Sequence, residues 1–188
     1  MEAVLKKEII SSKTLTRVMG IVVFIILTSL GAFVRIPLPF TPVPVTLQTF
    51  FVLLSGLFLG ASLGGVSQAS YILLGAWGLP IFTGAACGII YLLGPTAGYL
   101  AGFVVCAMVL GALKARFEQN FMSLFLLLCL GNFIILCSGA IWLKILTRCS
   151  LQHAVYIGFL PFIPGDLAKV VLAAGLYSRL KARLKEIF

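Results

Sequence analysis

Two charged side chains stand close together in an otherwise apolar part of the chain. Asp166 is the only acidic residue of positions 119–185, and Lys169 is the only lysine or arginine of positions 149–178. Because they are three positions apart, both side chains would lie on one face of a helix. Such a pair can bind a small ligand that has N–H donors, a carboxylate and an apolar middle. The alternative is an internal ion pair with a purely structural role.

The residues around Asp166 predict where this pair sits on its helix. Pro164 and Gly165 precede it, so we expect a helix to begin at residues 163–166 with Asp166 in its first turn. There the helix dipole favours a negative charge, and helix capping alone would explain Asp166. Each ion costs roughly 2.5–3.5 kcal/mol at mid-membrane, however, and a neutral residue caps a helix more cheaply. We therefore favour a functional role.

The composition places the chain among membrane proteins. Of its 188 residues, 61% are hydrophobic and only 10% are charged, against about 25% charged in soluble domains. Positions 36–113 hold no Asp, Glu, Lys or Arg at all. We predict an all-α membrane protein that forms a single transmembrane domain over residues 1–188, a bundle of six transmembrane helices. The six helices are expected near residues 17–35, 46–59, 63–77, 95–113, 121–143 and 163–177.

The connections between these helices differ in character. Residues 60–62 form a tight turn that makes the second and third helices an antiparallel hairpin. Residues 36–45 contain four prolines, which exclude a helix and favour a stiff, extended segment that covers the bundle like a lid. The glycines of residues 78–88 would let the backbone approach a ligand closely. Residues 151–162 are too short to cross and predict an interfacial or re-entrant piece.

The positive charges predict the topology. The formal net charge is +9, but the lysines and arginines cluster in three groups, which argues against nucleic-acid binding. The segments predicted to face the cytoplasm hold ten of them, and the outer loops hold three: Arg35, Lys144 and Arg148. We therefore expect both termini in the cytoplasm, as a basic segment 1–17 and a basic tail 179–188. Asp166 and Lys169 then lie at the outward end of the last helix.

Other chemistries find little support in the sequence. The five cysteines show no C-x-x-C pair and no histidine at metal-ligand spacing, so no metal site is predicted. No phosphate-binding G-x-x-x-x-G-K-[ST] motif is present, so the chain does not hydrolyse ATP by that route. A membrane enzyme that uses Asp166 as acid and Lys169 as base is the competing class. It lacks an evident nucleophile, so we expect no enzyme and assign no catalytic residue.

Five motifs, in this order, resemble the BioY family, the biotin-specific substrate-binding component of energy-coupling-factor (ECF) transporters. The motifs are R-I-P-L-P-F (35–40), P-V-P-V-T-L-Q (42–48), L-G-A-W-G-L-P-I-F (74–82), G-P-T-A-G-Y (94–99) and L-P-F-I-P-G-D-L-A-K (160–169). The resemblance covers roughly residues 20–180.

The resemblance implies a multi-pass protein of the bacterial plasma membrane that binds biotin near the outer surface. It implies as partners the lipid bilayer, an ECF transmembrane coupling subunit and two cytoplasmic ATPases, which use the ATP; no cofactor is expected on the chain itself. Asp166 would accept a ureido N–H of biotin, while Lys169 would bind a ligand oxygen or hold the aspartate. The full set of expected ligand contacts is Asp166, Lys169, Tyr91, Tyr99, Gln48, Thr46 and Gly84.

Some assignments stay open at this stage. Tyr91 and Tyr99 are also typical interfacial anchors. Thr28 and Ala32 form a small-xxx-small face on the first helix, which either packs inside the bundle or docks to the coupling subunit. The alternatives to biotin uptake are a binding subunit for another small vitamin and a solitary carrier that works without ATPases.

Overall fold

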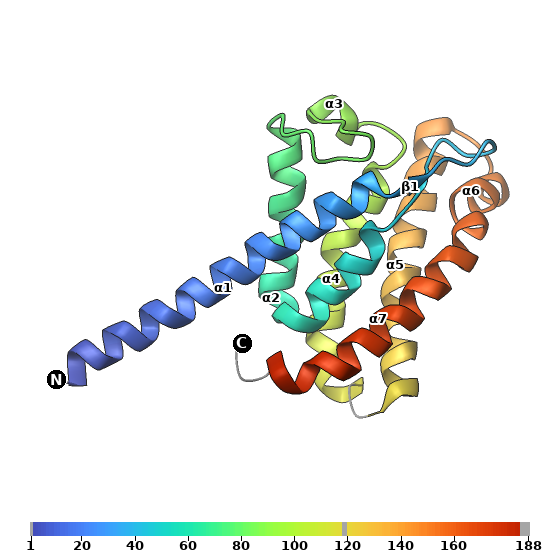
Figure 1. Cartoon of the computed structure of the whole chain (residues 1–188). Helices are drawn as coiled ribbons and strands as arrows, with labels where there is room; N and C mark the ends of the chain where they lie inside the picture. The colour runs from blue at the N-terminus through green and yellow to red at the C-terminus, as the bar shows by residue number, and fades with distance from the viewer. Residues whose placement is uncertain (1, 118–119, 185–188) are drawn as a thin grey trace.

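The computed structural model is almost entirely helical (Figure 1). It describes the backbone of residues 2–117 and 120–184, and the side chains of residues 13–117 and 120–181. Five helical stretches within these residues are long and apolar enough to cross a membrane, as expected for an all-helical membrane protein. The elements are α1 (Glu2–Phe33), β1 (Arg35–Ile36), β2 (Val45–Thr46), α2 (Gln48–Ala76), α3 (Ile89–Leu92), α4 (Ala97–Phe117), α5 (Phe121–Thr147), α6 (Leu151–Gly158), the 3-10 turn η1 (Leu160–Phe162) and α7 (Ile163–Leu184).

The helix α2 bends sharply at Gly60, whose φ of 81° and ψ of −179° interrupt the helical backbone. Glycine adopts this conformation without the steric cost of a Cβ atom. The two arms lie side by side, and both rise from the bend in Figure 1. A 3.1 Å hydrogen bond from Gln68 Nε2 in the second arm to Ser55 Oγ in the first joins them. The predicted hairpin of residues 46–59 and 63–77 is thus present as two arms of one element. The number of membrane crossings remains a prediction.

The helix α4 packs directly against this bend. A Cβ atom on Gly111 would lie 2.1 Å from the backbone nitrogen of Ala61, so only glycine allows this close approach. Lys114, about one turn further along α4, donates a 2.9 Å hydrogen bond from Nζ to the carbonyl of Leu57. This bond satisfies a carbonyl group near the end of the first α2 arm, where the helix leaves carbonyls without partners.

The helix α1 is longer than predicted at its beginning. It starts at Glu2, so residues 2–17 continue the helix and do not form a separate segment. No glycine or proline interrupts these residues, and charged side chains do not by themselves end a helix. In Figure 1 the first part of α1 projects away from the other helices. The basic residues Lys6, Lys7, Arg183 and Lys185 lie outside the described side chains.

The small residues of α1 face the inside of the bundle. Thr28 and Ala32 are both 0% exposed, and Gln68 Nε2 donates a 3.4 Å hydrogen bond to Thr28 Oγ1. Of the two alternatives for this pair, packing within the bundle is the one that the structure shows. Thr28 and Ala32 therefore leave no surface for another subunit, and the idea that they dock to a coupling subunit is wrong for this conformation.

Two connections meet at the end of the bundle drawn uppermost in Figure 1. Residues 37–44, which we call the proline strap, contain no helix and join β1 to β2, where Arg35 pairs with Thr46. Residues 78–88, the glycine loop, are anchored by a 2.7 Å hydrogen bond from the backbone N–H of Gly88 to the carbonyl of Gly75. The absence of helix agrees with the prediction from the prolines, but the strap is not extended throughout, because a turn at residues 39–40 and a bend at residues 42–43 reverse the chain between the antiparallel strands.

The last helix begins where it was predicted to begin, whereas an interfacial or re-entrant position of residues 151–162 stays a prediction. The segment 151–162 forms the short helix α6 and the turn η1, which lead directly into α7. The side chain of Ser150 caps α6 by accepting a 3.2 Å hydrogen bond from the backbone N–H of His153. Because α7 begins at Ile163, Asp166 lies in its first turn, as the Pro164–Gly165 pair predicts.

We expect the substitution Gly111→Ala to destabilise the fold, because its methyl group would force α4 away from the backbone of the α2 bend. Overpacking of this kind costs about 1–3 kcal/mol, which would lower the midpoint of thermal unfolding in detergent. Gly175→Ala in α7 is the matched control, since no atom lies within 4 Å of a Cβ at that position. Equal unfolding midpoints for the two variants would contradict the close packing at the bend.

Candidate ligand-binding site

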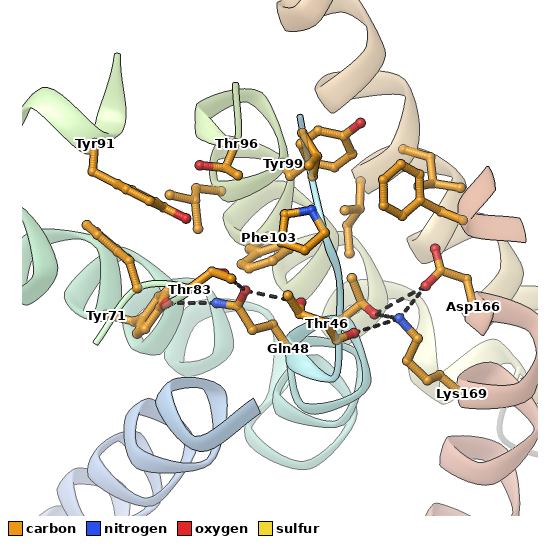
Figure 2. Close-up of a pocket in the computed structure, with 18 residues that line it drawn as sticks. Thr46, Gln48, Tyr71, Thr83, Tyr91, Thr96, Tyr99, Phe103, Asp166 and Lys169 are labelled. Atoms are coloured by element: carbon orange, nitrogen blue, oxygen red, sulfur yellow. Dashed lines mark hydrogen bonds and ion pairs between the residues drawn. The ribbon is translucent and has the colours of Figure 1, made fainter. Parts of the chain in front are cut away.

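A cavity lies beneath the proline strap and the glycine loop, enclosed by α2, α4, α5 and α7 (Figure 2). About 510 Å³ of space lies between its lining atoms, open solvent at the mouth included, and the cavity forms a narrow slot. It is lined by Val43, Pro44, Thr46, Gln48, Thr49, Tyr71, Phe82, Thr83, Tyr91, Thr96, Tyr99, Leu100, Phe103, Ile135, Leu136, Phe162, Asp166 and Lys169.

The only charged groups in this lining are Asp166 and Lys169. Their side chains come from one face of the first two turns of α7, and Lys169 Nζ lies 2.5 Å from Asp166 Oδ1. Asp166 is 2% exposed and Lys169 is 7% exposed, so both charges are buried. The positive end of the α7 dipole further favours the carboxylate, by about 0.3–1 kcal/mol in exposed helices.

Two threonines complete the surroundings of the ion pair. Lys169 Nζ donates a 2.8 Å hydrogen bond to the carbonyl of Thr46 in β2, and a 2.7 Å hydrogen bond to Thr49 Oγ1 in α2. The Thr49 hydroxyl in turn lies 3.5 Å from Asp166 Oδ1, to which it donates. These contacts join β2, α2 and α7 at one side of the cavity, as Figure 2 shows.

Two polar atoms of the lining are buried and have no hydrogen-bond partner among the described residues: Asp166 Oδ2 and Thr96 Oγ1. Buried polar groups are nearly always paired, and each unpaired group costs about 1–3 kcal/mol. Both residues line the same cavity, so unmet polar groups stand at the candidate ligand site. Two further unpaired atoms, on Gln68 and Asn132, belong to residues outside this lining.

Gln48 connects the roof of the cavity to its wall. Its Oε1 atom accepts hydrogen bonds from the hydroxyls of Thr46 and Thr83, both at 3.2 Å. Its Nε2 atom donates to the Tyr71 hydroxyl at 2.7 Å, and this hydroxyl donates to the carbonyl of Ile81 at 3.0 Å. Because Thr83 and Ile81 belong to the glycine loop, one amide holds the loop, β2 and both arms of α2 together.

Aromatic rings form the apolar walls. Phe82 stacks on Tyr91 with ring centroids 4.7 Å apart and lies edge-on to Tyr71 at 5.6 Å. A Cβ atom on Gly75 would lie 2.2 Å from the Phe82 ring, so the ring is seated directly on this glycine. On the other side, the Tyr99 ring faces the cavity, while its hydroxyl donates a 2.5 Å hydrogen bond to the Gly158 carbonyl. Tyr99 therefore offers its ring, and its hydroxyl is already engaged.

Six of the seven residues predicted to contact a ligand line the cavity: Asp166, Lys169, Tyr91, Tyr99, Gln48 and Thr46. Gly84 does not; it lies against the guanidinium of Arg35 at the edge of the strap, where a Cβ atom would come within 2.5 Å of Nη1. Contact with a ligand remains a prediction for all seven. Four polar residues of the lining were not predicted from the sequence: Tyr71 and the threonines Thr49, Thr83 and Thr96.

A second cavity is larger than the first but has fewer polar side chains in its lining. It lies beside the second arm of α2 with about 1000 Å³ between its lining atoms, open solvent again included, and its lining contains Trp77 and Ile89 but no charged residue. Trp77 is 90% exposed there, as expected for a surface that faces lipid. Since its lining offers a polar molecule little beyond the hydroxyl of Ser70, we assign the ligand site to the narrow cavity.

Comparisons with known proteins agree with one another. The model of the BioY family matches residues 5–186. The biotin transporter BioY of Thermotoga maritima is 42% identical over 159 residues, which cover 85% of this chain and 92% of that protein. A probable biotin transporter BioY of Pyrococcus horikoshii is 37% identical over 163 residues, with 86% and 93% covered. The crystal structure of the S-component for biotin from an ECF-type ABC transporter matches with a TM-score of 0.81, at 27% identity, over 94% of this chain and 93% of that chain.

We expect Gln48→Leu to loosen the glycine loop, because the hydroxyls of Thr46 and Thr83 would lose their shared acceptor. Hydrogen–deuterium exchange should be about tenfold faster at the amide of Phe82, which is bonded to the Ala86 carbonyl. The control is Gln152→Leu, the same change at an exposed position of α6. Unchanged protection of the loop in Gln48→Leu would contradict the proposed role of this amide.

Proposed function

The chain belongs to the BioY family, and we propose that it is the biotin-binding membrane subunit of an ECF transporter. The observation that carries this proposal is the unpaired Oδ2 atom of Asp166, a buried acceptor on a residue that lines the cavity. Because the related proteins are transporters, we assign Asp166 and Lys169 to ligand binding and not to catalysis.

The chemistry of biotin fits the lining. Biotin has a cyclic urea with two N–H donors, an apolar sulfur-containing ring and an aliphatic chain that ends in a carboxylate. An N–H donor of the urea can pair with Asp166 Oδ2, a charge-assisted hydrogen bond that is stronger than a neutral one. The apolar middle of the molecule suits the rings of Phe82, Tyr91 and Tyr99, which line the slot on two sides.

We further propose six membrane crossings with both termini in the cytoplasm. The bend at Gly60 supports six, because the two arms of α2 return to the same end of the bundle. The last turns of α4 and α7 lie at the end of the bundle away from the proline strap in Figure 1, and they carry the basic residues Lys114, Arg116, Arg179 and Lys181, as the positive-inside rule requires of a cytoplasmic face. The cavity then opens outward from the plasma membrane, on the side from which biotin arrives.

The partners follow from the type of transporter. An S-component binds substrate but does not itself supply energy, so we propose that a transmembrane coupling subunit and two cytoplasmic ATPases drive release of biotin inside. The sequence contains no phosphate-binding motif of the G-x-x-x-x-G-K-[ST] type, which supports the assignment of ATP hydrolysis to partners.

Purified protein should bind labelled biotin saturably and release it chemically unchanged. We expect Asp166→Asn to weaken binding about 10- to 100-fold, because a hydrogen bond to a charged group is lost. Asp166→Asn also leaves the buried Lys169 ammonium without its counter-charge, although the hydrogen bonds to Thr46 and Thr49 remain, and this destabilises the fold. The double variant Asp166→Asn/Lys169→Met removes that charge, so it should fold and still bind weakly. Lys144→Met, at an exposed position of α5, is the control for charge loss. Full affinity in the folded double variant would contradict the proposal.

Uptake in cells separates the ECF subunit from a solitary carrier. In a biotin-requiring host without its own transporter, we expect uptake at low external biotin only when the coupling subunit and both ATPases are co-expressed. Uptake should be lost when the phosphate-binding lysine of both ATPases is replaced, although equal amounts of the chain are present in the membrane. Concentrative uptake by the chain alone would favour the solitary carrier and exclude the ATP-dependent mechanism.

A further inference from the structure

The short helix α3 carries two different surfaces. Ile90 is 85% exposed, and its neighbours Ile89 and Leu93 are also mostly exposed. Between them, Tyr91 packs against the core, and its ring stacks on Phe82 and lines the slot. One helical turn therefore joins a wall of the slot to an exposed apolar surface.

The exposed surface of α3 continues one side of the second α2 arm. Val66, Leu73 and Trp77 are exposed there, and their spacing of seven and then four positions places them along one face of the helix. The second cavity joins this face to α3, because Leu73, Trp77 and Ile89 all line it. The arm belongs to a helix that is apolar enough to cross a membrane, so lipid covers its exposed apolar side. Lipid is therefore the occupant expected next to Ile89 as well.

The backbone on both sides of α3 is suited to contact with lipid. Non-helical backbone next to lipid must find its hydrogen-bond partners within the protein. Amides throughout residues 79–97 do so by donating to carbonyls of residues 74–94, and they belong to Leu79, Ile81, Phe82, Gly88, Tyr91, Leu93, Gly94 and Ala97. Residues 78–96 also contain no Asp, Glu, Lys or Arg. This part of the chain therefore suits the boundary between lipid and water better than it suits bulk water.

Trp77 indicates the depth of this surface in the membrane. It is almost fully exposed at the end of the second α2 arm. Its indole combines a large apolar ring with one N–H donor, and such side chains concentrate at the membrane–water interface. In Figure 1 this end of α2 and α3 lie at the same end of the bundle as the proline strap. Trp77 and α3 therefore lie close to the membrane surface on the side of the strap.

We infer that the exposed face of α3, formed by Ile89, Ile90 and Leu93, inserts into the lipid interface beside Trp77 and holds the Tyr91 wall of the slot in place. The bilayer is then a binding partner that sets how readily the slot releases its ligand. The kinetic half of this inference rests on the proposed function, because biotin is the ligand whose release is measured. The insertion itself requires no ligand and is tested separately.

The first experiment measures insertion by fluorescence quenching in nanodiscs whose lipids carry bromine near the top of their chains. Ile90→Trp is combined with Trp77→Phe, so that Trp142 is the only other tryptophan of the chain. Trp77→Phe alone is the matched control, because it reports the quenching of Trp142. We expect the fluorescence added by Ile90→Trp to be strongly quenched in brominated lipid, since an indole at this position would lie among the upper parts of the chains.

The second experiment measures the rate at which labelled biotin leaves the protein in nanodiscs. The proteins compared are the unchanged chain, Ile90→Ser, Ile90→Leu and the control Ile145→Ser. Ile145 is a suitable control because it is an exposed isoleucine in the last turn of α5 and does not line the slot. Because Ile90 is 85% exposed, Ile90→Ser removes few contacts with the protein itself, so a purely structural role predicts no change in rate.

We expect Ile90→Ser to speed biotin release about three- to tenfold, because the polar side chain no longer gains from burial in lipid and the Tyr91 wall is held less firmly. Ile90→Leu keeps the apolar contact and should release biotin at the unchanged rate. Ile145→Ser should also leave the rate unchanged, since the last turn of α5 carries no residue of the slot.

The outcomes separate the two halves of the inference. Absence of added quenching with Ile90→Trp shows that α3 does not insert and overturns the whole inference. Quenching that disappears when each nanodisc holds two copies of the chain assigns this face to a second copy instead of lipid. Equal release rates for Ile90→Ser and Ile145→Ser overturn the control of the slot by the bilayer. Failure of the unchanged, folded protein to bind biotin overturns the proposed function and the kinetic half, while the quenching still decides the insertion.

Discussion

The buried ion pair between Asp166 and Lys169 is the interaction on which the cavity depends. Each ion loses several kcal/mol of hydration when it is buried, and the pair is tolerated only if its remaining donors and acceptors are satisfied. Thr46 and Thr49 satisfy the ammonium, although they lie more than 100 residues earlier in the chain. The need to neutralise one charge therefore brings β2 and the start of α2 against the first turns of α7, and this contact closes one side of the slot.

The same contacts leave one oxygen of the Asp166 carboxylate without a hydrogen-bond partner. One oxygen of Asp166 is committed to the protein, and the other is left without a partner inside the cavity. The ammonium of Lys169 lies against the carboxylate in an apolar setting, and the carboxylate also stands at the positive end of the α7 dipole. On the opposite wall Gln48 holds the glycine loop through its amide, and Phe82 rests on Gly75. Rigid walls and few unmet polar groups are what a selective small-molecule site requires.

Much of this was predictable from residues with strong local preferences. Asp166 and Lys169 stand out because charges are rare here, Pro164–Gly165 fixes the start of α7, and four prolines exclude a helix from the strap. The threonines were not predictable, because a threonine in an apolar span usually packs unnoticed, and whether its hydroxyl is paired depends on tertiary contacts. The same reason applies to Thr28 and Ala32: small residues permit close packing, but the sequence does not say with which helix. Gly84 was assigned to the ligand because glycine permits close approach, yet here the approaching group is the Arg35 side chain.

A structure of the biotin-bound protein at a resolution that orients the ligand tests this mechanism most directly. We expect an N–H of the cyclic urea within hydrogen-bond distance of Asp166 Oδ2, with the contacts of Lys169 to Thr46, Thr49 and Asp166 unchanged. A ligand held through its carboxylate by Lys169, with Asp166 Oδ2 still unpaired, would contradict the central role assigned to the free oxygen of Asp166.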